Sequence, residues 1–389
     1  MKPRKIKENI SLLGAIDWDR RVFDALVPIP DGTSYNSYFI QGSEKTVLID
    51  TVEPTMSKIL MKQLDSLPEV DYVISLHAEQ DHSGSLECVL DRYPKARLIT
   101  NKKCKNMLIE LLNLPEERID IIKDGDTLSL GDKTLKFIFT PWVHWPETMS
   151  AYLEEDKILF SCDFFGAHLA TTDTFVTEEA IVYESAKRYY AEIMMPFRKH
   201  IIKNLVKLDN YDIEMIAPSH GPVYPKAEFI LDAYKSWVSD KPKNKVLLTY
   251  ITMHESTKMM VDYLVEILTD RGVSVEKLNL GVTDIGKVII SLVDAATIIF
   301  ATPTVLGGPH PDVLYAAYMT NALKPKAKYY SIIGSFGWNG KPIKLLNDIL
   351  GDLEAESLEC VLSRGVPKEE VYKELELLAD TIAEKHSLL

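Results

Sequence analysis

The chain has 389 residues, of which 46% are hydrophobic and 26% are charged. This length is enough for two or three domains, and the composition excludes an intrinsically disordered chain. The net charge of −13 disfavours nucleic acid and anionic membranes as partners.

Neither a secretory signal nor an apolar run of the about 18–20 residues needed for a membrane span is present. The most apolar stretch, Val288–Ala301, is interrupted by Asp294. The four cysteines are scattered and form no C-x-x-C motif. We therefore expect a reduced, cytoplasmic protein without a membrane partner and without a four-cysteine iron site.

A domain boundary is expected near residue 243, because the polar, proline-bearing segment 239–245 precedes an apolar run. Residues 1–242 then form the first domain, in which short strands alternate with helix-like stretches. The expected strands are Ser37–Ile40, Thr46–Ile49, Val73–Ser75, Lys133–Phe139 and Lys157–Phe160.

The most restrictive motif, His77-Ala-Glu79-Gln-Asp81-His82, follows the expected strand Val73–Ser75. Four side chains that favour metal ions lie within six residues. They cannot all face one way on a helix or a strand, so we expect a loop on which they converge. Converging carboxylates and imidazoles are costly unless a cation lies among them. The alternative is a polar loop that is simply solvated.

Three further candidate ligands follow apolar runs later in the chain. His144 lies in the sequence PWVHWP, Asp163 in FSCDFFG and His220 in APSHGP. With the first motif they make four imidazoles and three carboxylates. Seven ligands are too many for one ion and suit two, with one carboxylate bridging.

Residues 243–389 alternate between strand and helix, which predicts a doubly wound, five-stranded parallel sheet. The expected elements are strand Val246–Ile251, helix Thr257–Asp270, strand Ser274–Leu278, helix Asp284–Leu292, strand Thr297–Ala301, helix Asp312–Leu323, strand Lys328–Ile333, helix Ile343–Leu350, strand Glu356–Val361 and helix Lys368–Lys385.

Three loops at the carboxyl ends of these strands are candidates for a cofactor site. The first, Thr252–Thr257, opens a helix as the phosphate loop of a flavodoxin-type fold does, although an ordinary helix cap would look similar. The loops Thr302–Gly308 and Gly334–Gly340 follow the third and fourth strands, beside the topological switch point. Their glycines let the backbone approach a flavin ring edge, or they merely close the strands.

Glu255 would repel a phosphate, so we expect its side chain to point to solvent. Either Phe336 or Trp338 could cover a ring face of the flavin. The candidate cofactor-binding residues are Thr252, Met253, His254, Ser256, Thr257, Thr302, Pro303, Thr304, Val305, Leu306, Gly307, Gly308, Ser335, Phe336, Gly337 and Trp338.

The ligand pattern resembles the metallo-β-lactamase fold, in which an early acidic residue, here Asp50, orders the site. Hydrolytic members carry H-x-H-x-D-H, whereas this chain has Glu79 in place of the second histidine. The additional carboxylate suits iron better than zinc. This variant, followed by a flavodoxin-like half, resembles the flavodiiron protein family over essentially the whole chain, including the segments Asp17–Asp19, Gly32–Tyr38 and Pro141–Thr148.

The resemblance implies a metallo-β-lactamase-like αββα sandwich with two non-haem iron ions in residues 1–242 and an FMN-binding, flavodoxin-like domain in residues 243–389. By residue, it implies that His77, Glu79 and His144 hold the iron nearer the flavin, that Asp81, His82 and His220 hold the distal iron, and that Asp163 bridges them.

The implied activity is reduction of O2 to water, an oxygen-detoxifying role in an anaerobe, with nitric oxide reduction to N2O on the same site as the alternative. The electron donor would be F420H2, as in methanogen F420H2 oxidases, or a separate rubredoxin. The family also implies a head-to-tail homodimer, or a tetramer built from it, in which the flavin of one subunit faces the irons of the other.

Other residues have less specific expectations. Tyr189 and Tyr190 are candidate O–H donors to a bound oxygen species or helix-packing residues, and Trp142 and Trp145 are a contact surface or part of the core. Phe23-Asp24 occupies the place of a histidine present in some relatives, which leaves proton delivery open. Surface or packing roles are expected for most of the remaining histidines, which are His168, His200, His254, His310 and His386.

Two readings compete with a flavodiiron oxidoreductase. One is a dizinc hydrolase fused to a flavodoxin-like docking domain, which Glu79 disfavours. The other is a flavin electron carrier with a structural first domain, which leaves the seven candidate ligands unexplained. Metal analysis separates the flavodiiron hypothesis from the hydrolase, because the former predicts about two irons and one FMN per chain and the latter predicts zinc without flavin.

Overall fold

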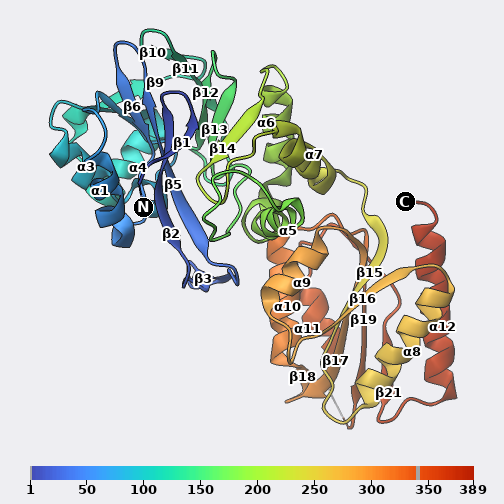
Figure 1. Cartoon of the computed structure of the whole chain (residues 1–389). Coiled ribbons are helices and arrows are strands. Elements are labelled where there is room, and N and C mark those ends of the chain that lie inside the picture. The colour runs from blue at the N-terminus through green and yellow to red at the C-terminus, as the bar shows by residue number, and fades with distance from the viewer. Residues whose placement is uncertain (1, 339–341) are drawn as a thin grey trace. The chain divides into compact units, whose positions relative to one another are not determined.

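The computed structural model describes residues 2–338 and 342–389 (Figure 1). Contacts between residues divide the chain into two compact units, Met1–Val238 and Ser239–Leu389. The first strand of the second unit, β15, begins at Lys243, where the sequence suggests a new domain. Among the described residues, no helix has both the length and the apolar character to cross a membrane.

Two β-sheets pack face to face in the first unit, with helices on their outer sides (Figure 1). The first sheet has the order β1 (Arg4–Lys7), β2 (Ile10–Asp17), β5 (Thr33–Gln41), β6 (Thr46–Ile49), β7 (Tyr72–Ile74), β8 (Arg97–Asn101) and β9 (Ile119–Ile122). The second has the order β10 (Thr127–Ser129), β11 (Thr134–Phe139), β12 (Met149–Leu153), β13 (Ile158–Cys162) and β14 (Met215–Pro218). A small hairpin, β3 (Val22–Phe23) and β4 (Val27–Pro28), lies apart from both sheets.

The helices of this unit are α1 (Ser57–Leu64), α2 (Gln80–Ser83), α3 (Leu86–Arg92), α4 (Lys102–Leu112), α5 (Glu179–Tyr189), α6 (Arg198–Leu208) and α7 (Ala227–Val238). Its shorter turns are η1 (Pro54–Met56), η2 (Glu116–Arg118), η3 (Tyr190–Met194) and η4 (Met195–Phe197).

Alternation along the strands builds the two cores of this unit. Leu12 of β2 faces the core between the sheets, where it joins Phe137 of β11. The next residue, Leu13, faces the opposite side, where Leu60 of α1 and Leu108 of α4 cover the first sheet. Because side chains on a strand alternate between faces, one apolar strand supplies both layers of an αββα sandwich.

Parallel strands of this unit end at the same edge of their sheets. In the second sheet β13 pairs in parallel with β14, and in the first sheet β7 pairs in parallel with both β6 and β8. The residues that follow the ends of β7, β13 and β14 include His77, Asp163 and His220. We expected the metal motif to be a loop throughout. In the structure, however, Asp81 and His82 lie on the single-turn helix α2.

The second unit contains a parallel sheet with the order β16 (Ser274–Asn279), β15 (Lys243–Tyr250), β17 (Ala295–Val305), β19 (Tyr329–Phe336) and β20 (Glu356–Ser357). Two further strands pair with it, β18 (Gly308–Pro309) with β17 in antiparallel fashion and β21 (Val361–Arg364) with β19. The helices are α8 (Ser256–Asp270), α9 (Ile285–Leu292), α10 (Pro311–Leu323), α11 (Pro342–Ile349) and α12 (Glu369–His386).

The last expected strand, Glu356–Val361, is broken in the structure. Its residues are divided between β20 and β21, which both pair in parallel with β19. Between them, the Ser331 hydroxyl donates to the Glu359 carbonyl at 2.6 Å and takes the place of a ladder hydrogen bond. The prediction of one continuous strand was therefore wrong, because a side chain of the neighbouring strand pairs with this backbone.

A buried histidine fastens the last helix to the sheet of the second unit. Asn244 donates its amide to the Gly272 carbonyl, so its Oδ1 accepts from His386 Nδ1 at 2.8 Å. Nε2 of the same ring is then the acceptor for the Thr297 hydroxyl at 2.7 Å. These contacts require the neutral imidazole, and burial lowers the pKa of His386 accordingly.

Stability of the second unit is expected to depend on pH through His386. Its folded-state pKa is lowered, so its contribution is fully present above the unfolded pKa of about 6.5 and is lost as the pH falls through the folded value. The free energy of unfolding, measured with urea on the whole chain, should therefore fall less between pH 8 and pH 5 in His386→Gln than in the wild type. Identical pH profiles for the two proteins would contradict this role.

Candidate functional site

The structure brings all seven predicted metal ligands together at one end of the sandwich. His77, Glu79, His144 and Asp163 form one group of neighbouring ligand atoms, and Asp81, His82 and His220 form a second. Each group lies within 4.8 Å across. The donors come from the ends of β7, β13 and β14, from α2 and from the turn between β11 and β12.

Asp163 lies between the two groups and faces both. Its Oδ2 is 3.4 Å from Nε2 of His77 and 3.4 Å from Nε2 of His144. Its Oδ1 is 3.0 Å from Nε2 of His82 and 3.3 Å from Nε2 of His220. One carboxylate thus divides its two oxygens between two imidazole pairs, which is the geometry of a bridging ligand.

A further carboxylate belongs to each group. Oε2 of Glu79 is 3.1 Å from Nε2 of His77 and 3.1 Å from Nε2 of His144. The carboxylate of Asp81 is 3.2 Å from Nε2 of His82 through Oδ1 and 3.1 Å from Nε2 of His220 through Oδ2. Each candidate ion site therefore has two imidazoles, one carboxylate of its own and a share of Asp163.

The outer nitrogens of two imidazoles show which way their lone pairs point. Nδ1 of His220 lies 2.7 Å from the carbonyl oxygen of Ser34, which can only accept, so this nitrogen carries the proton. Nδ1 of His77 lies 2.6 Å from Oε1 of Glu147, which also accepts from the Ala78 N–H at 3.1 Å. Both rings therefore turn Nε2 toward carboxylate oxygens, where either a second ring proton or a metal ion has to lie between nitrogen and oxygen.

Unpaired atoms inside the cluster fit a metal centre. Both carboxylate oxygens of Asp81, Oδ2 of Asp163 and Nε2 of His82 are buried and lack a hydrogen-bond partner among the described residues. Buried polar atoms normally have a hydrogen-bond partner. These four atoms therefore indicate a bound ion that accepts their lone pairs. Imidazole and carboxylate donors without thiolate favour iron and similar ions over soft metals.

The same electrostatics appears in the pKa values of the donors. Burial disfavours the charge of Asp163, but the imidazoles around it, His82 foremost, hold the pKa of that carboxyl well below its usual range. Burial lowers the pKa of His220, yet hydrogen bonds to Asp163 and Asp81 raise it to about 10. The buried carboxylates are thus stabilised by positive charge nearby. A metal ion supplies this charge in place of the protons on the imidazoles.

Two predicted tyrosines have different surroundings. The Tyr189 hydroxyl donates to Oδ1 of Asp163 at 2.9 Å, so this residue supports the candidate bridging carboxylate. Tyr190 packs against Tyr234 and Trp237 and points its hydroxyl at the Trp237 carbonyl, 3.4 Å away. Tyr189 therefore touches the site, whereas the contacts of Tyr190 are those of a packing residue.

A small cavity of about 30 Å³ adjoins the donors. Its lining outside the seven donors includes Phe23, Val27, His168, Tyr189 and Ile193. A cavity of this size is large enough for a water molecule, and the donors themselves form part of its wall. The side chain of Asp24 also lines it, and burial together with Glu79 and Asp81 raises the pKa of Asp24.

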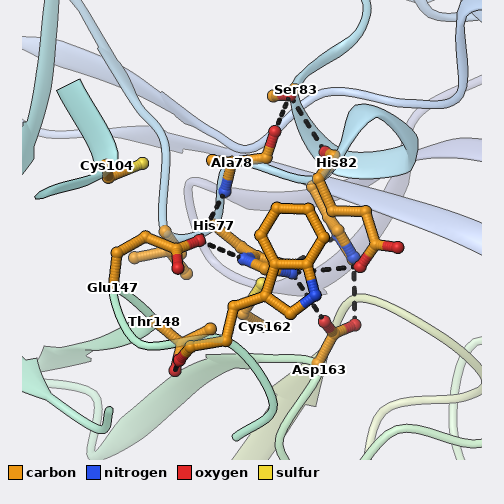
Figure 2. Close-up of polar contacts among 12 residues, drawn as sticks. His77, Ala78, His82, Ser83, Cys104, Glu147, Thr148, Cys162 and Asp163 are labelled. Carbon is orange, nitrogen blue, oxygen red and sulfur yellow. Dashed lines mark hydrogen bonds and ion pairs between the residues drawn. The ribbon is translucent and has the colours of Figure 1, made fainter. Parts of the chain in front are cut away.

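Several residues near the donors have roles that the sequence did not indicate. His168 is buried, with its ring 4.9 Å from that of His220 and Nδ1 2.9 Å from the Thr33 hydroxyl. Figure 2 shows Glu147 beside the His77 ring, with its carboxylate 2.6 Å from Nδ1. The signal for Glu147 was present, because it lies three residues after His144, but nothing in the sequence tells which partner it has.

Asp50 takes the ordering position expected from its place after β6. Its Oδ1 accepts from the Leu76 N–H at 2.8 Å, just before the metal motif. Burial raises the pKa of Asp50 to about 6, so the carboxylate is mostly ionised at neutral pH. Trp145 packs edge-on against the His77 ring at 4.9 Å, and Trp142 is 39% exposed and stacks on Phe197.

The three cofactor loops lie at the carboxyl ends of β15, β17 and β19, as the sequence predicted, but two are shorter than expected. β17 extends through Val305 and β19 through Phe336, with Pro303 paired to Ser335. Only Leu306 and Gly307 form the turn to β18, both with positive φ. Residues 339 and 340 of the expected third loop lie outside the described residues.

Polar groups in these loops fit a phosphorylated cofactor. The hydroxyls of Thr252 and Thr304 are buried and lack a partner among the described residues. The Thr257 and Ser335 hydroxyls lie 2.9 Å apart and connect the first and third loops. The side chain of Thr302 is used within its own hairpin, where Oγ1 accepts from the His310 N–H.

Three apolar side chains of the loops are exposed: Met253, Leu306 and Trp338. Glu255 points outward, as predicted, with a side chain that is 68% exposed and 3.9 Å from Lys258. A planar, partly apolar ring with a phosphate tail, such as FMN, matches this combination of unpaired hydroxyls and uncovered apolar side chains.

The metal-free chain should bind two divalent ions with a gain in stability. When free metal exceeds the dissociation constant 100-fold, the gain per site is about 2.7 kcal/mol. Anaerobic titration with Fe(II), followed by thermal unfolding, should show two ions per chain in the wild type and neither at high affinity in Asp163→Ala. The control is His200→Ala, because His200 packs against Trp142 instead of the donors. Two tight ions in Asp163→Ala would contradict the bridging geometry.

Comparison with known proteins places the chain in a family. A family model described as "ODP family beta lactamase" matches residues 33–221. An uncharacterised protein of Methanocaldococcus jannaschii is 36% identical over 95% of this chain and 95% of its own length. A nitric oxide reductase of Moorella thermoacetica is 32% identical over 94% of this chain and 92% of its own. A coenzyme F420H2 oxidase of Methanothermobacter marburgensis is 32% identical over 90% of both.

Solved structures agree over the whole chain. The rubredoxin oxygen:oxidoreductase of Desulfovibrio gigas superposes with a TM-score of 0.95 at 29% identity, covering 100% of this chain and 99% of its own. The flavodiiron protein of Giardia intestinalis superposes with a TM-score of 0.89 at 26% identity, covering 99% and 98%. These matches confirm the predicted fold class, a metallo-β-lactamase-like sandwich followed by a flavodoxin-like sheet. The chain belongs to the flavodiiron protein family.

Proposed function

We propose that the protein is an oxidoreductase that reduces O2 to water at a pair of iron ions, with electrons relayed through FMN. The observation that carries this proposal is the position of Asp163, which divides its two oxygens between two histidine pairs. Two redox-active ions that share a carboxylate, together with a flavin, supply several electrons to one small oxidant in quick succession.

The proposed iron nearer the flavin is held by His77, Glu79 and His144. The distal iron is held by Asp81, His82 and His220, with Asp163 shared. This assignment follows the family resemblance, and the division of the donors into two groups supports it.

The remaining residues of the site control what reaches the irons. Phe23, Val27 and Ile193 line part of the cavity with apolar atoms. The cavity beside the donors is small, which fits a small substrate. The Tyr189 hydroxyl holds Oδ1 of Asp163 and keeps that oxygen facing His82 and His220.

Nitric oxide reduction to N2O is the second candidate activity. It uses the same donors and the same cavity, and a relative that is 32% identical is named nitric oxide reductase. The names of other relatives, rubredoxin-oxygen oxidoreductase and coenzyme F420H2 oxidase, support O2 as the substrate and either rubredoxin or F420H2 as the donor. The dizinc hydrolase reading is less favoured, because Glu79 takes the place of an imidazole.

We also propose a head-to-tail homodimer in which the flavin of one subunit serves the irons of the other. The proposal rests on the family resemblance. Apolar side chains left uncovered at the flavin loops support it, above all Leu306 and Trp338, which are 103% and 91% exposed. A cytoplasmic location belongs to the same proposal and rests on the scattered cysteines, all of which are free thiols.

Thr252→Val should weaken FMN binding without harming the apoprotein. The substitution removes a buried hydroxyl that has no partner in the described residues and that we assign to the phosphate. Loss of one such hydrogen bond costs about 1 kcal/mol, or roughly a fivefold higher dissociation constant by fluorescence titration. The matched control is Thr269→Val, whose hydroxyl donates within α8. Equal FMN affinities in the two variants would remove Thr252 from the proposed site.

The overall function is tested by anaerobic assay of the purified holoprotein with F420H2 and, separately, with reduced rubredoxin. Each donor is offered O2 and NO in turn, and iron and FMN are quantified in the same sample. We expect about two irons and one FMN per chain, and faster consumption of O2 than of NO. A sample replete with iron and flavin that consumes neither gas would refute the oxidoreductase proposal.

A further inference from the structure

The carboxylate of Glu147 lies behind His77, on the side away from the other donors (Figure 2). Neither side chain is exposed to solvent. Oε1 of Glu147 is 2.6 Å from Nδ1 of His77, and the same oxygen accepts from the Ala78 N–H at 3.1 Å. One oxygen therefore holds both the ring of His77 and the backbone that follows it.

This double contact determines the tautomer of His77. An oxygen that accepts from the Ala78 N–H has to accept from the imidazole as well, so Nδ1 of His77 carries the proton. In the neutral ring, which is the form that binds a metal ion, Nε2 then presents its lone pair on the side of Glu79, 3.1 Å away, and of Asp163, 3.4 Å away. A ring rotation that exchanged the two nitrogens would break the contact with Glu147.

The position of Glu147 is itself determined by neighbouring elements. Asn101, the N-cap of α4, donates its amide to the Glu147 carbonyl at 2.6 Å while its Oδ1 accepts from the N–H groups of Lys103 and Cys104. The next residue, Thr148, donates to the Thr140 carbonyl at 2.6 Å and closes the turn that bears His144. The backbone of Glu147 is therefore held by contacts from a helix cap and from a turn, which places its side chain beside His77.

The negative charge of Glu147 has no Lys or Arg partner within ion-pair distance among the described residues. Its second oxygen, Oε2, is buried without a hydrogen-bond partner in the same part of the chain. A carboxylate in such a place is expensive to bury. The N–H of the His77 ring, together with a metal ion bound on the far side of this ring, would offset the cost of burying the Glu147 carboxylate.

We propose that Glu147 is a positioning residue that fixes the His77 tautomer and places a negative charge behind this ligand. The inference rests on the proposed diiron function. A carboxylate hydrogen-bonded to a ligating imidazole makes that imidazole a stronger donor and favours the more oxidised metal. Glu147 thereby strengthens iron binding in the group of His77, Glu79 and His144 and lowers the reduction potential of that iron.

Two substitutions separate the geometric role from the electrostatic role. In Glu147→Gln the amide oxygen still accepts from both N–H groups but the charge is lost. In Glu147→Ala the ring loses its support as well. The control is Asp156→Asn, a buried carboxylate of the same unit that pairs with Lys7 and Lys133 and touches no donor.

Iron affinity is measured by anaerobic competition of Fe(II) with a chelator, and the midpoint potential by redox titration of the holoprotein. We expect Glu147→Ala to bind one of its two irons roughly 10- to 100-fold more weakly than the wild type. Glu147→Gln should recover most of this affinity but show a higher midpoint potential. Asp156→Asn should match the wild type in both measurements.

Wild-type affinity and potential in both Glu147 variants would overturn the inference, as would an equal loss of iron in Asp156→Asn. If Glu147→Ala does not fold, the potential of Glu147→Gln alone decides, and an unchanged value overturns the proposed charge effect. A wild-type protein without iron would instead refute the proposed function, so the two failures are distinguishable.

Discussion

The candidate metal centre depends on one arrangement, a single carboxylate surrounded by four imidazole nitrogens. Asp163 follows β13, the strand that pairs in parallel with β14, and His220 follows β14. The other sheet contributes His77 and, through α2, His82. Because each oxygen of Asp163 faces one histidine pair, neither group of donors is complete without it. Occupation of one site therefore affects the other through a shared ligand, which suits two ions that act on one small molecule.

Contacts that hold the donors in place connect distant parts of the chain. His220 is held by the carbonyl of Ser34, 186 residues earlier, and His77 by Glu147, 70 residues later. Asp50 holds the backbone at Leu76, immediately before the motif. The site thus exists only when both sheets are assembled, and metal binding stabilises the assembled sandwich rather than any local segment.

The sequence predicted the second unit more completely than the surroundings of the site. Alternating strands and helices follow from local apolar patterns, so the order of the main elements was predicted, whereas the break between β20 and β21 and the short strand β18 were missed. The seven candidate donors that lie together in the structure were also proposed from the sequence, because each follows a strand or lies in a compact polar motif. The role of Glu147 and the burial of His168 were not, since both result from contacts between segments far apart in the chain. The loops around Pro303 and Ser335 were expected to be irregular, but pairing of β17 with β19 extends the sheet through them.

The number of carboxylates around the donors explains why the position of Glu79 matters. Glu79, Asp81 and Asp163 supply three negative charges, and Glu147 and Asp50 stand directly behind the donors with two more. Two Fe(II) ions carry four positive charges and two Fe(III) ions carry six, so five carboxylates lie midway between the two states. A histidine at position 79 would remove one negative charge and shift this balance toward the divalent state, as in a dizinc hydrolase. Burial of charge is tolerable only when it is nearly neutralised. The carboxylates of this chain are therefore matched to a metal pair that changes its charge during turnover, which a redox-inactive pair of zinc ions does not do.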